Sequence, residues 1–281
     1  MGNYEEKREL LKSRIGGYAL EDMIVAFSGG VDSSLLLRIA CDASRKTKRR
    51  VYGILLHTML HPKNELEEAK KIAQEAGAFF HVLKVDELEG AGIEENPVDR
   101  CYRCKRYLFE KVLEEAEHLG VSRILEGTNE DDLHAYRPGI RAVRELGIIS
   151  PLADAGFTKE DVRRLAGEYG MSVSKKPSTP CLATRFPYGV RLSYEAMRKV
   201  EQGEAYLKSL GFYDVRLRVH GDIVRMEVDR GSMGRIIEYG EKITGYLKKL
   251  GYVYITLDLE GFRSGSMDEK IEKQMVSVIE Q

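Results

Sequence analysis

The sequence predicts an α/β fold: a parallel twisted sheet with helices on both faces, followed by a small C-terminal α+β domain. Two observations support the larger domain. Short apolar runs typical of buried strands alternate with stretches of helical spacing, and glycines follow the first run directly. One observation supports the smaller domain, because the order of elements after residue 192 changes to helix, strand, strand, helix, strand.

The larger domain is expected to contain strands joined by helices. A helix over 3–20, a strand over 23–28, a helix over 34–43 and a strand over 51–58 come first. A charged helix over 63–76, a strand over 79–85, a helix over 101–119, a strand over 122–127 and a helix over 158–169 follow. Such alternation forms parallel sheets, whose ligands bind beyond the carboxyl ends of the strands.

The C-terminal region begins with an aperiodic stretch, 172–192, that is rich in Pro, Ser and Thr. We interpret it as an ordered functional loop or a domain junction. A helix over 193–210, a strand pair over 214–221 and 222–228, a helix over 232–249 and a strand over 252–259 come after it. We therefore expect two domains, 1–175 and 176–281.

The charge of the chain is balanced, with 44 Lys and Arg against 45 Asp and Glu in 281 residues. This argues against a protein that mainly wraps nucleic acid, because phosphate contact needs a surplus of basic side chains on one face. No apolar run approaches the roughly 18 residues of a membrane span, and the N-terminus lacks the apolar core of a signal peptide. We expect a cytoplasmic protein whose partners are neither membranes nor nucleic acids.

A candidate phosphate-binding loop stands between the first expected strand and the helix after it. Its residues are Ser28, Gly29, Gly30, Val31, Asp32, Ser33 and Ser34. The glycines leave room for a phosphate, while N–H groups, the helix dipole and the serine hydroxyls stabilise its charge. Asp32 can hold Mg²⁺ against the phosphates. The loop lacks the lysine of a Walker loop, and the alternative interpretation is a glycine turn that merely joins strand to helix.

Four cysteines in a reducing compartment favour metal, redox or sulfur chemistry over disulfides. Cys101 and Cys104 lie three residues apart at an expected helix start, so both thiols can contact one metal centre. Cys181 stands in the irregular stretch, with Arg185 nearby to stabilise a thiolate. Thiolates alone suit an iron–sulfur cluster better than mixed ligands do. Cys41 follows apolar residues on a helix and is expected in the core.

Other interpretations of the CxxC pair stay open at this point. The two residues can be incidental helix cysteines or a simple redox switch. A zinc site would need further ligands from Cys181, Cys41 or the six histidines.

Several motifs together resemble known families. The string SGGVDSS at 28–34 is similar to the loop of the PP-loop ATP pyrophosphatases, which have an adenine nucleotide α-hydrolase-like fold and cleave ATP to AMP and pyrophosphate. The stretches 135–139, 178–189 and 256–265, in this order, resemble the LarE family of that superfamily. The resemblance implies ATP and Mg²⁺ as cofactors and places the strand ends at Thr58 and Gly127 near the nucleotide.

LarE-like proteins are sulfur transferases in the biosynthesis of the nickel-pincer nucleotide cofactor. The resemblance implies adenylation of a carboxylate of pyridinium-3,5-biscarboxylic acid mononucleotide, then replacement of AMP by sulfur to give a thiocarboxylate, with Asp32, Cys181 and Arg185 acting in catalysis. In the sacrificial version, the residue matching Cys181 gives up its sulfur and becomes dehydroalanine. Three-cysteine relatives hold a 4Fe–4S cluster that carries an extra sulfide. The presence of Cys101, Cys104 and Cys181 favours that version, with Cys181 as a ligand.

The resemblance also assigns substrate contacts to the C-terminal domain. Arg216 and Arg218 alternate on one strand, so they share a face. Residues matching them hold the phosphate of the substrate, assisted by a carboxylate matching Glu204. On the residues alone, a solvated sheet face is the alternative. The family forms homohexamers, so we expect a homo-oligomer with this domain in substrate binding and oligomerisation, and the sulfide donor stays unidentified.

Three rival functions share parts of this pattern. A tRNA thiolase can combine the loop with a CxxC and a distant cysteine, but the balanced charge and the lack of a recognisable RNA-binding appendage argue against it. An amidotransferase-like ligase such as an NAD synthetase shares the loop but does not need three cysteines. A metal-storage module regulated by ATP would bind nucleotide without releasing pyrophosphate.

Overall fold

The computed structural model describes residues 3–60, 65–177, 180–263 and 265–267. The chain divides into two compact units. Unit 1 comprises residues 1–93 and 99–179, and unit 2 comprises residues 94–98 and 180–281. The chain therefore passes from one unit to the other three times along its length.

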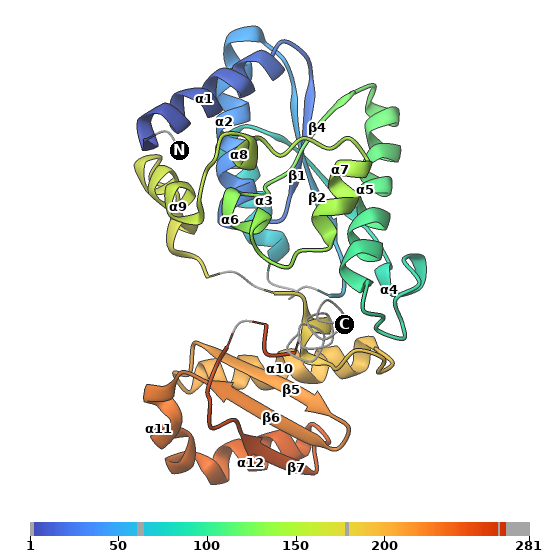
Figure 1. Ribbon diagram of the computed structural model, residues 1–281, viewed down its shortest axis with the longest axis vertical. Helices are drawn as coiled ribbons and strands as arrows, with labels where there is room; N and C mark the ends of the chain where they lie inside the picture. The colour runs from blue at the N-terminus through green and yellow to red at the C-terminus, as the bar shows by residue number, and fades with distance from the viewer. Residues whose placement is uncertain (1–2, 61–64, 178–179, 264, 268–281) are drawn as a thin grey trace, which may run out of the picture. The chain divides into compact units, whose positions relative to one another are not determined.

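Unit 1 contains a four-stranded sheet with the order β3–β2–β1–β4 (Figure 1). Its strands are β1 (Met23–Phe27), β2 (Val51–His57), β3 (Phe79–Lys84) and β4 (Arg123–Leu125). All three strand pairs are parallel, and a bridge between Leu125 and Ile149 continues the ladder beside β4. The predicted parallel sheet is confirmed, and the carboxyl ends of its strands lie at one edge.

Helices cover both faces of this sheet (Figure 1). The long helices are α1 (Tyr4–Tyr18), α2 (Val31–Thr47), α3 (Glu65–Ala76), α5 (Arg100–Leu119) and α9 (Lys159–Glu168). One apolar core joins Met23 and Val25 of β1 to α1, α2, α3 and α9, while another joins Ile24 to α5. Because side chains alternate along a strand, these cores lie on opposite faces of the sheet.

Shorter helices connect these elements. They are α4 (Glu87–Gly90), α6 (Glu130–Leu133), α7 (Gly139–Glu145), α8 (Pro151–Asp154) and the 3₁₀ helix η1 (Ser172–Lys175). The sequence did not indicate them, because segments this short display no helical period.

Unit 2 contains a three-stranded sheet with the order β5–β6–β7. The predicted strand pair is present as antiparallel β5 (Val215–His220) and β6 (Ile223–Val228), with Gly221 in the left-handed region between them. Strand β7 (Tyr254–Leu257) runs parallel to β6. The 3₁₀ helix η2 (Leu182–Arg185) and helix α10 (Tyr194–Ser209) precede this sheet. The small α+β arrangement agrees with the prediction.

The single helix expected over 232–249 is interrupted in the structure. The 3₁₀ helix η3 (Arg230–Ser232) leads into α11 (Met233–Glu238) and then α12 (Gly240–Lys249). Tyr239 separates the last two, with φ −88° and ψ 7°. Its ring packs edge-on against Phe212 at a centroid distance of 6.0 Å. We attribute the break to this local packing, which periodicity does not reveal.

Residues 94–98 belong to unit 2 although unit 1 precedes and follows them in the sequence. Asn96 is fully buried with φ 49°, and its Nδ2 donates to the carbonyl oxygens of Phe186 at 3.2 Å and Pro187 at 2.6 Å. The Leu192 N–H donates to the Glu94 carbonyl at 2.6 Å. These contacts hold the segment against the stretch that follows Cys181.

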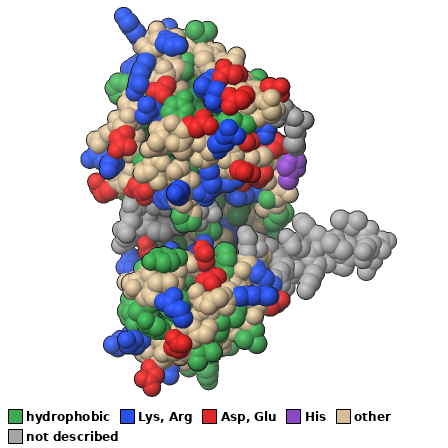
Figure 2. Space-filling model, turned by 90° about the vertical axis from the view of Figure 1, so that its left-hand side faces the viewer, with side chains coloured by type: hydrophobic (Ala, Val, Ile, Leu, Met, Phe, Trp, Pro, Cys, Tyr) green, Lys and Arg blue, Asp and Glu red, His purple; other side chains and the backbone are tan. Residues whose placement is uncertain are grey.

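The surface charge of unit 1 and the hydropathy of the helices agree with the balanced, moderately apolar composition. Acidic and basic side chains are interspersed over the face of unit 1 that Figure 2 presents. Within the described ranges, no helix has both the length and the apolar character needed to cross a membrane.

Candidate functional site

The predicted phosphate loop lies at the carboxyl edge of the unit 1 sheet, where β1 ends and α2 begins. Gly29 has φ 71°, in the left-handed region that favours glycine. Gly30 is the N-cap of α2, and no side chain caps this helix, whereas side chains cap α1, α6, α9 and α10. The first N–H groups of α2 thus lack a side-chain acceptor, which suits an anionic ligand.

The serines of the loop have different surroundings. The Ser28 N–H donates to Ser33 Oγ at 3.1 Å, and the two hydroxyl oxygens are also 3.1 Å apart. Ser33 Oγ donates to the Gly30 carbonyl at 3.4 Å. Ser34 is fully buried, and among the described residues its Oγ has no hydrogen-bond partner. Ser28 and Ser33 therefore close the loop, while Ser34 retains unused hydrogen-bonding capacity.

The carboxyl end of β4 packs against this loop. A Cβ atom at Gly127 would lie 3.0 Å from the Ser33 nitrogen and 3.3 Å from the Asp32 carbonyl carbon, so only glycine fits without a shift of the backbone. Asn129 Nδ2 donates to Asp32 Oδ1 at 3.1 Å. The structure therefore brings Gly127 into contact with the start of α2.

Two lysines that sequence reasoning missed also contact the loop. Lys159, the first residue of α9, forms an ion pair with Asp32. Lys176 follows η1, and its Nζ lies 3.4 Å from the Gly29 carbonyl oxygen and 2.7 Å from Glu68 Oε2. These lysines are separated from their loop partners by 127 and 147 positions, so no local motif reveals them.

Thr58 lies beyond β2 and is buried beside Glu87. The Thr58 hydroxyl and the Leu60 N–H both hydrogen-bond the Glu87 carboxyl, the latter at 2.8 Å. Burial raises the pKa of Glu87. Its Oε2 has no partner within the part of the chain that the structure describes. Glu87 thus orders residues 58–60, which follow β2.

Cys101 and Cys104 lie three residues apart near the start of α5 in unit 1. Cys101 is exposed and Cys104 partly exposed, and Arg100 Nη2 lies 3.9 Å from Cys101 Sγ. Cys181 belongs to unit 2. In the described ranges, no three His, Cys, Asp or Glu side chains are grouped to hold a metal ion. The shared role of these cysteines as cluster ligands stays a prediction.

Cys41 differs from the other three cysteines. It is buried in the core on α2, as predicted. Burial raises the pKa of its thiol to about 12. This residue is therefore unsuited to sulfur or metal chemistry at neutral pH.

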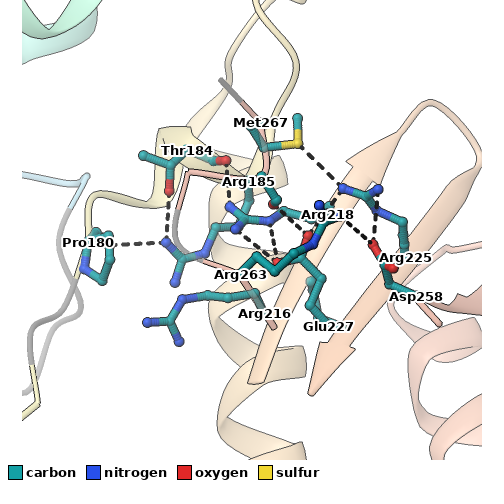
Figure 3. Close-up of polar contacts among 12 residues, drawn as sticks. Pro180, Thr184, Arg185, Arg216, Arg218, Arg225, Glu227, Asp258, Arg263 and Met267 are labelled. Carbon is teal, nitrogen blue, oxygen red and sulfur yellow. Dashed lines mark hydrogen bonds and ion pairs between the residues drawn. The ribbon is translucent and has the colours of Figure 1, made fainter. Parts of the chain in front are cut away.

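Arg185 is fully buried in unit 2 and anchors the backbone at Cys181. Its Nε and Nη2 bind both oxygens of Glu204, at 2.8 and 2.9 Å. Its Nη1 donates to the carbonyl oxygens of Pro180 and Cys181, at 3.2 and 3.3 Å (Figure 3). Glu204 Oε1 also accepts the Leu217 N–H at 3.1 Å. The predicted residues Arg185 and Glu204 are thus brought together as a bidentate buried pair.

Arg218 forms a second buried pair. Its Nε and Nη2 each lie 3.0 Å from Glu227 Oε2, and its Nη1 donates to the Thr184 carbonyl at 2.9 Å. Arg225 lies 3.1 Å from Glu227 Oε1 and 3.2 Å from Asp258 Oδ2 (Figure 3). These pairs connect η2 to the sheet of unit 2.

Arg216 differs from these neighbouring arginines. Among the described residues no carboxylate lies within ion-pair distance of it, and its guanidinium donates to the Val215 carbonyl at 2.8 Å. Figure 3 shows its side chain beside the paired arginines. Burial lowers the pKa of Arg216, and the charges of Arg185 and Arg218 lower it further. Its Cζ also lies 5.2 Å from the centre of the Phe262 ring. A half-buried guanidinium that forms no ion pair among the described residues and feels two other arginines is a suitable contact for an anion.

Comparisons with known proteins cover both units. A family model described as a PP-loop domain matches residues 4–135. A pyridinium-3,5-bisthiocarboxylic acid mononucleotide synthase from Lactiplantibacillus plantarum is 35% identical over 258 residues, 92% of this chain and 93% of that protein. An uncharacterised protein of Synechocystis sp. is 34% identical over 272 residues, 96% of this chain and 99% of that protein.

One comparison concerns the rival tRNA thiolase. A tRNA-specific 2-thiouridylase from Rickettsia bellii is 26% identical, and the match covers 56% of this chain and 52% of that protein. The similarity is lower and covers much less of either chain than that of the synthase.

Proposed function

Because this chain belongs to the LarE family, we propose that it is an ATP-dependent sulfurtransferase that converts a carboxylate of pyridinium-3,5-biscarboxylic acid mononucleotide into a thiocarboxylate. The observation that carries this proposal is the 35% identity to the bisthiocarboxylic acid mononucleotide synthase, which extends over nearly the full length of both proteins. The PP-loop match and the uncapped start of α2 support ATP as the activating substrate.

The reaction divides into two displacements. A carboxylate oxygen of the substrate attacks the α-phosphorus of ATP, the bond to the bridging oxygen breaks, and pyrophosphate leaves. A sulfur nucleophile then attacks the acyl carbon, and AMP leaves with the carboxylate oxygen. Adenylation is needed because a carboxylate has no leaving group that sulfur can displace.

Residues of unit 1 stabilise the phosphates in the first displacement. The N–H groups at the start of α2 and the Ser34 hydroxyl are suited to donate hydrogen bonds to the departing pyrophosphate. Asp32, with Asn129 beside it, would hold Mg²⁺, which would neutralise phosphate charge. The carboxylate oxygens of Asp32 are the kind of ligand that Mg²⁺ prefers, so the residues fit the ion.

Residues of unit 2 position the pyridinium mononucleotide, which is the acceptor of the sulfur. We assign the phosphate of the mononucleotide to Arg216, since its positive charge lacks a carboxylate partner among the described residues. Arg218 contributes positive charge while it is paired with Glu227. Arg185 acts chiefly by fixing the backbone at Cys181, because its three guanidinium nitrogens all contact protein atoms.

The sulfur nucleophile of the second displacement involves the cysteines. We favour a 4Fe–4S cluster held by Cys101, Cys104 and Cys181, because three thiols fit the donor chemistry of such a cluster. When bound, it would supply a sulfide from its open iron as the nucleophile. The alternative keeps Cys181 as donor: its Sγ bonds to the acyl carbon as AMP leaves, and a base then removes the Cα proton while the Cβ–Sγ bond breaks, which releases the thiocarboxylate and leaves dehydroalanine. In the cluster version the partners include a sulfide donor, and in both versions they include further copies of this chain.

Anaerobic turnover with ATP, Mg²⁺, the pyridinium mononucleotide and sulfide tests the proposal. We expect pyrophosphate release and a product in which sulfur replaces one carboxylate oxygen, both measured by mass spectrometry and phosphate assay. Absence of product with intact ATP binding would contradict the function. Loss of one sulfur from the polypeptide at Cys181 would replace the cluster version by the sacrificial one. An unchanged absorbance spectrum in Cys101→Ala would contradict the ligand role of that residue.

A further inference from the structure

The phosphate loop carries no positive charge of its own. Within 28–34 the charged residue is Asp32, an acid. The triphosphate of ATP is strongly anionic, and a Walker loop meets it with a lysine in the loop itself. The positive charge in this protein must come from outside the loop, apart from any bound cation.

Lys159 is the first residue of α9, and its position is fixed by hydrogen bonds. The Thr158 side chain caps α9 through a capping box with Asp161, and the Lys159 N–H donates to Asp131 Oδ2 at 2.7 Å. The Lys159 N–H and the capping box that surrounds it therefore fix the first turn of α9, while the Lys159 ammonium reaches Asp32. Its side chain is 33% exposed, so the ammonium is accessible to a ligand.

Lys176 is fixed in a comparable way on another side of the loop. Arg163 donates to the carbonyl oxygens of Ser174 at 2.8 Å and of Lys176 at 2.9 Å. The Lys176 ammonium reaches the Gly29 carbonyl and Glu68, and its side chain is 21% exposed. Both ammonium groups thus contact a carboxylate, an anion that a phosphate oxygen can replace.

We propose that Lys159 and Lys176 bind the β- and γ-phosphates of ATP and together replace the lysine of a Walker loop. The proposal rests on the use of ATP in the proposed function. In the nucleotide-bound protein, Lys159 leaves Asp32 for a phosphate oxygen, and Asp32 becomes available to a cation. Lys176 exchanges Glu68 for phosphate in the same way. Both lysines are assigned as phosphate-binding residues, since each ammonium contacts the loop and pairs with a carboxylate that phosphate can replace.

The experiment titrates ATP, pyrophosphate and AMP separately into wild type, Lys159→Gln and Lys176→Gln by calorimetry. The matched control is Lys175→Gln, because Lys175 is the adjacent lysine, is exposed and has no ion-pair partner among the described residues. Removal of a charge-assisted contact should weaken ATP and pyrophosphate binding about 10- to 100-fold in both variants. AMP, which lacks the outer phosphates, should bind these variants as it binds wild type.

Two results would overturn the proposal. One is ATP affinity in Lys159→Gln and Lys176→Gln equal to that of Lys175→Gln. The other is an equal loss of ATP and AMP binding, which would indicate a purely structural role and would come with a lower melting temperature of the nucleotide-free protein. These titrations need neither acceptor nor sulfur source. If the lysine variants lost affinity for ATP and pyrophosphate as expected, but the wild type formed no thiocarboxylate, only the proposed function would therefore be refuted.

Discussion

The candidate anion sites of the two units are built in opposite ways. In unit 1 the site consists mainly of backbone, with a left-handed glycine, an uncapped helix start and a strand end that admits only Gly127. In unit 2 the site consists of side chains, with buried arginine–carboxylate pairs surrounding Arg216. A backbone site is specified by adjacent residues, whereas a side-chain site depends on partners that only the fold brings together.

Substitutions in the two sites should therefore have different effects on protein stability and on ligand binding. Loss of one lysine in unit 1 removes a ligand contact but leaves the loop closed by Ser28 and Ser33. Loss of one partner in unit 2 leaves a buried charge without compensation, which is strongly destabilising. Variants of unit 1 should therefore affect mainly nucleotide affinity, and most variants of unit 2 should affect folding first.

The largest effect is expected for Glu204→Ala. This change leaves Arg185 buried without its bidentate partner and should lower the free energy of unfolding by about 3–5 kcal/mol. Urea unfolding followed by circular dichroism measures it. The control is Glu195→Ala on the same helix, whose exposed pair with Lys199 should matter little. Equal unfolding midpoints for the two variants would contradict the inference that buried side-chain pairs stabilise unit 2.

The next effect is expected for Gly127→Ala. The added methyl meets the Ser33 nitrogen at 3.0 Å, and overpacking of this kind costs about 1–3 kcal/mol. We expect weaker ATP binding, measured by calorimetry, with the fold retained. Gly167→Ala is the matched control, because a Cβ there meets no atom within 4 Å. ATP affinity unchanged from Gly167→Ala would show that close approach of β4 does not shape the loop.

A smaller effect on stability distinguishes Arg216→Gln from Arg218→Gln. Arg216 is an arginine whose charged form is disfavoured by burial and by Arg185 and Arg218, so its removal should change the free energy of unfolding by less than about 1 kcal/mol. Binding of the substrate mononucleotide should nevertheless fall. Arg218→Gln should be the more destabilising change, since it removes a partner of the buried Glu227. If Arg216→Gln proved less stable to urea than Arg218→Gln, the roles assigned to the two arginines would be wrong.

The smallest effect concerns the pH dependence of stability at Glu87. Its pKa in the folded protein is raised by burial, so its contribution is complete below the unfolded value of about 4.3 and is lost as pH rises through the folded pKa. Across that window, the free energy of unfolding of wild type should fall relative to that of Glu87→Gln. Thermal melts over a pH series measure this, and parallel profiles would disprove it.

The comparison also explains how much the sequence could predict. The strands of unit 1, the loop at 28–34 and the β5–β6 hairpin follow from local apolar patterns and turn residues, and the structure contains them. Lys159 and Lys176 could not be assigned, because they reach the loop through the tertiary arrangement of α9 and η1. Arg185 was identified, but its contact with Glu204 depends on how η2 packs against α10.

The location of residues 94–98 bears on how this protein can be divided. Asn96 fills a fully buried position whose hydrogen bonds go to Phe186 and Pro187. A fragment that starts at residue 180 would lack this peptide and expose two carbonyl groups that Asn96 now satisfies. Unit 2 is therefore a discontinuous module, and grafting it onto another chain requires the short segment as a complementing peptide. Exchange of residues 180–281 alone between relatives would carry over an incomplete folding unit.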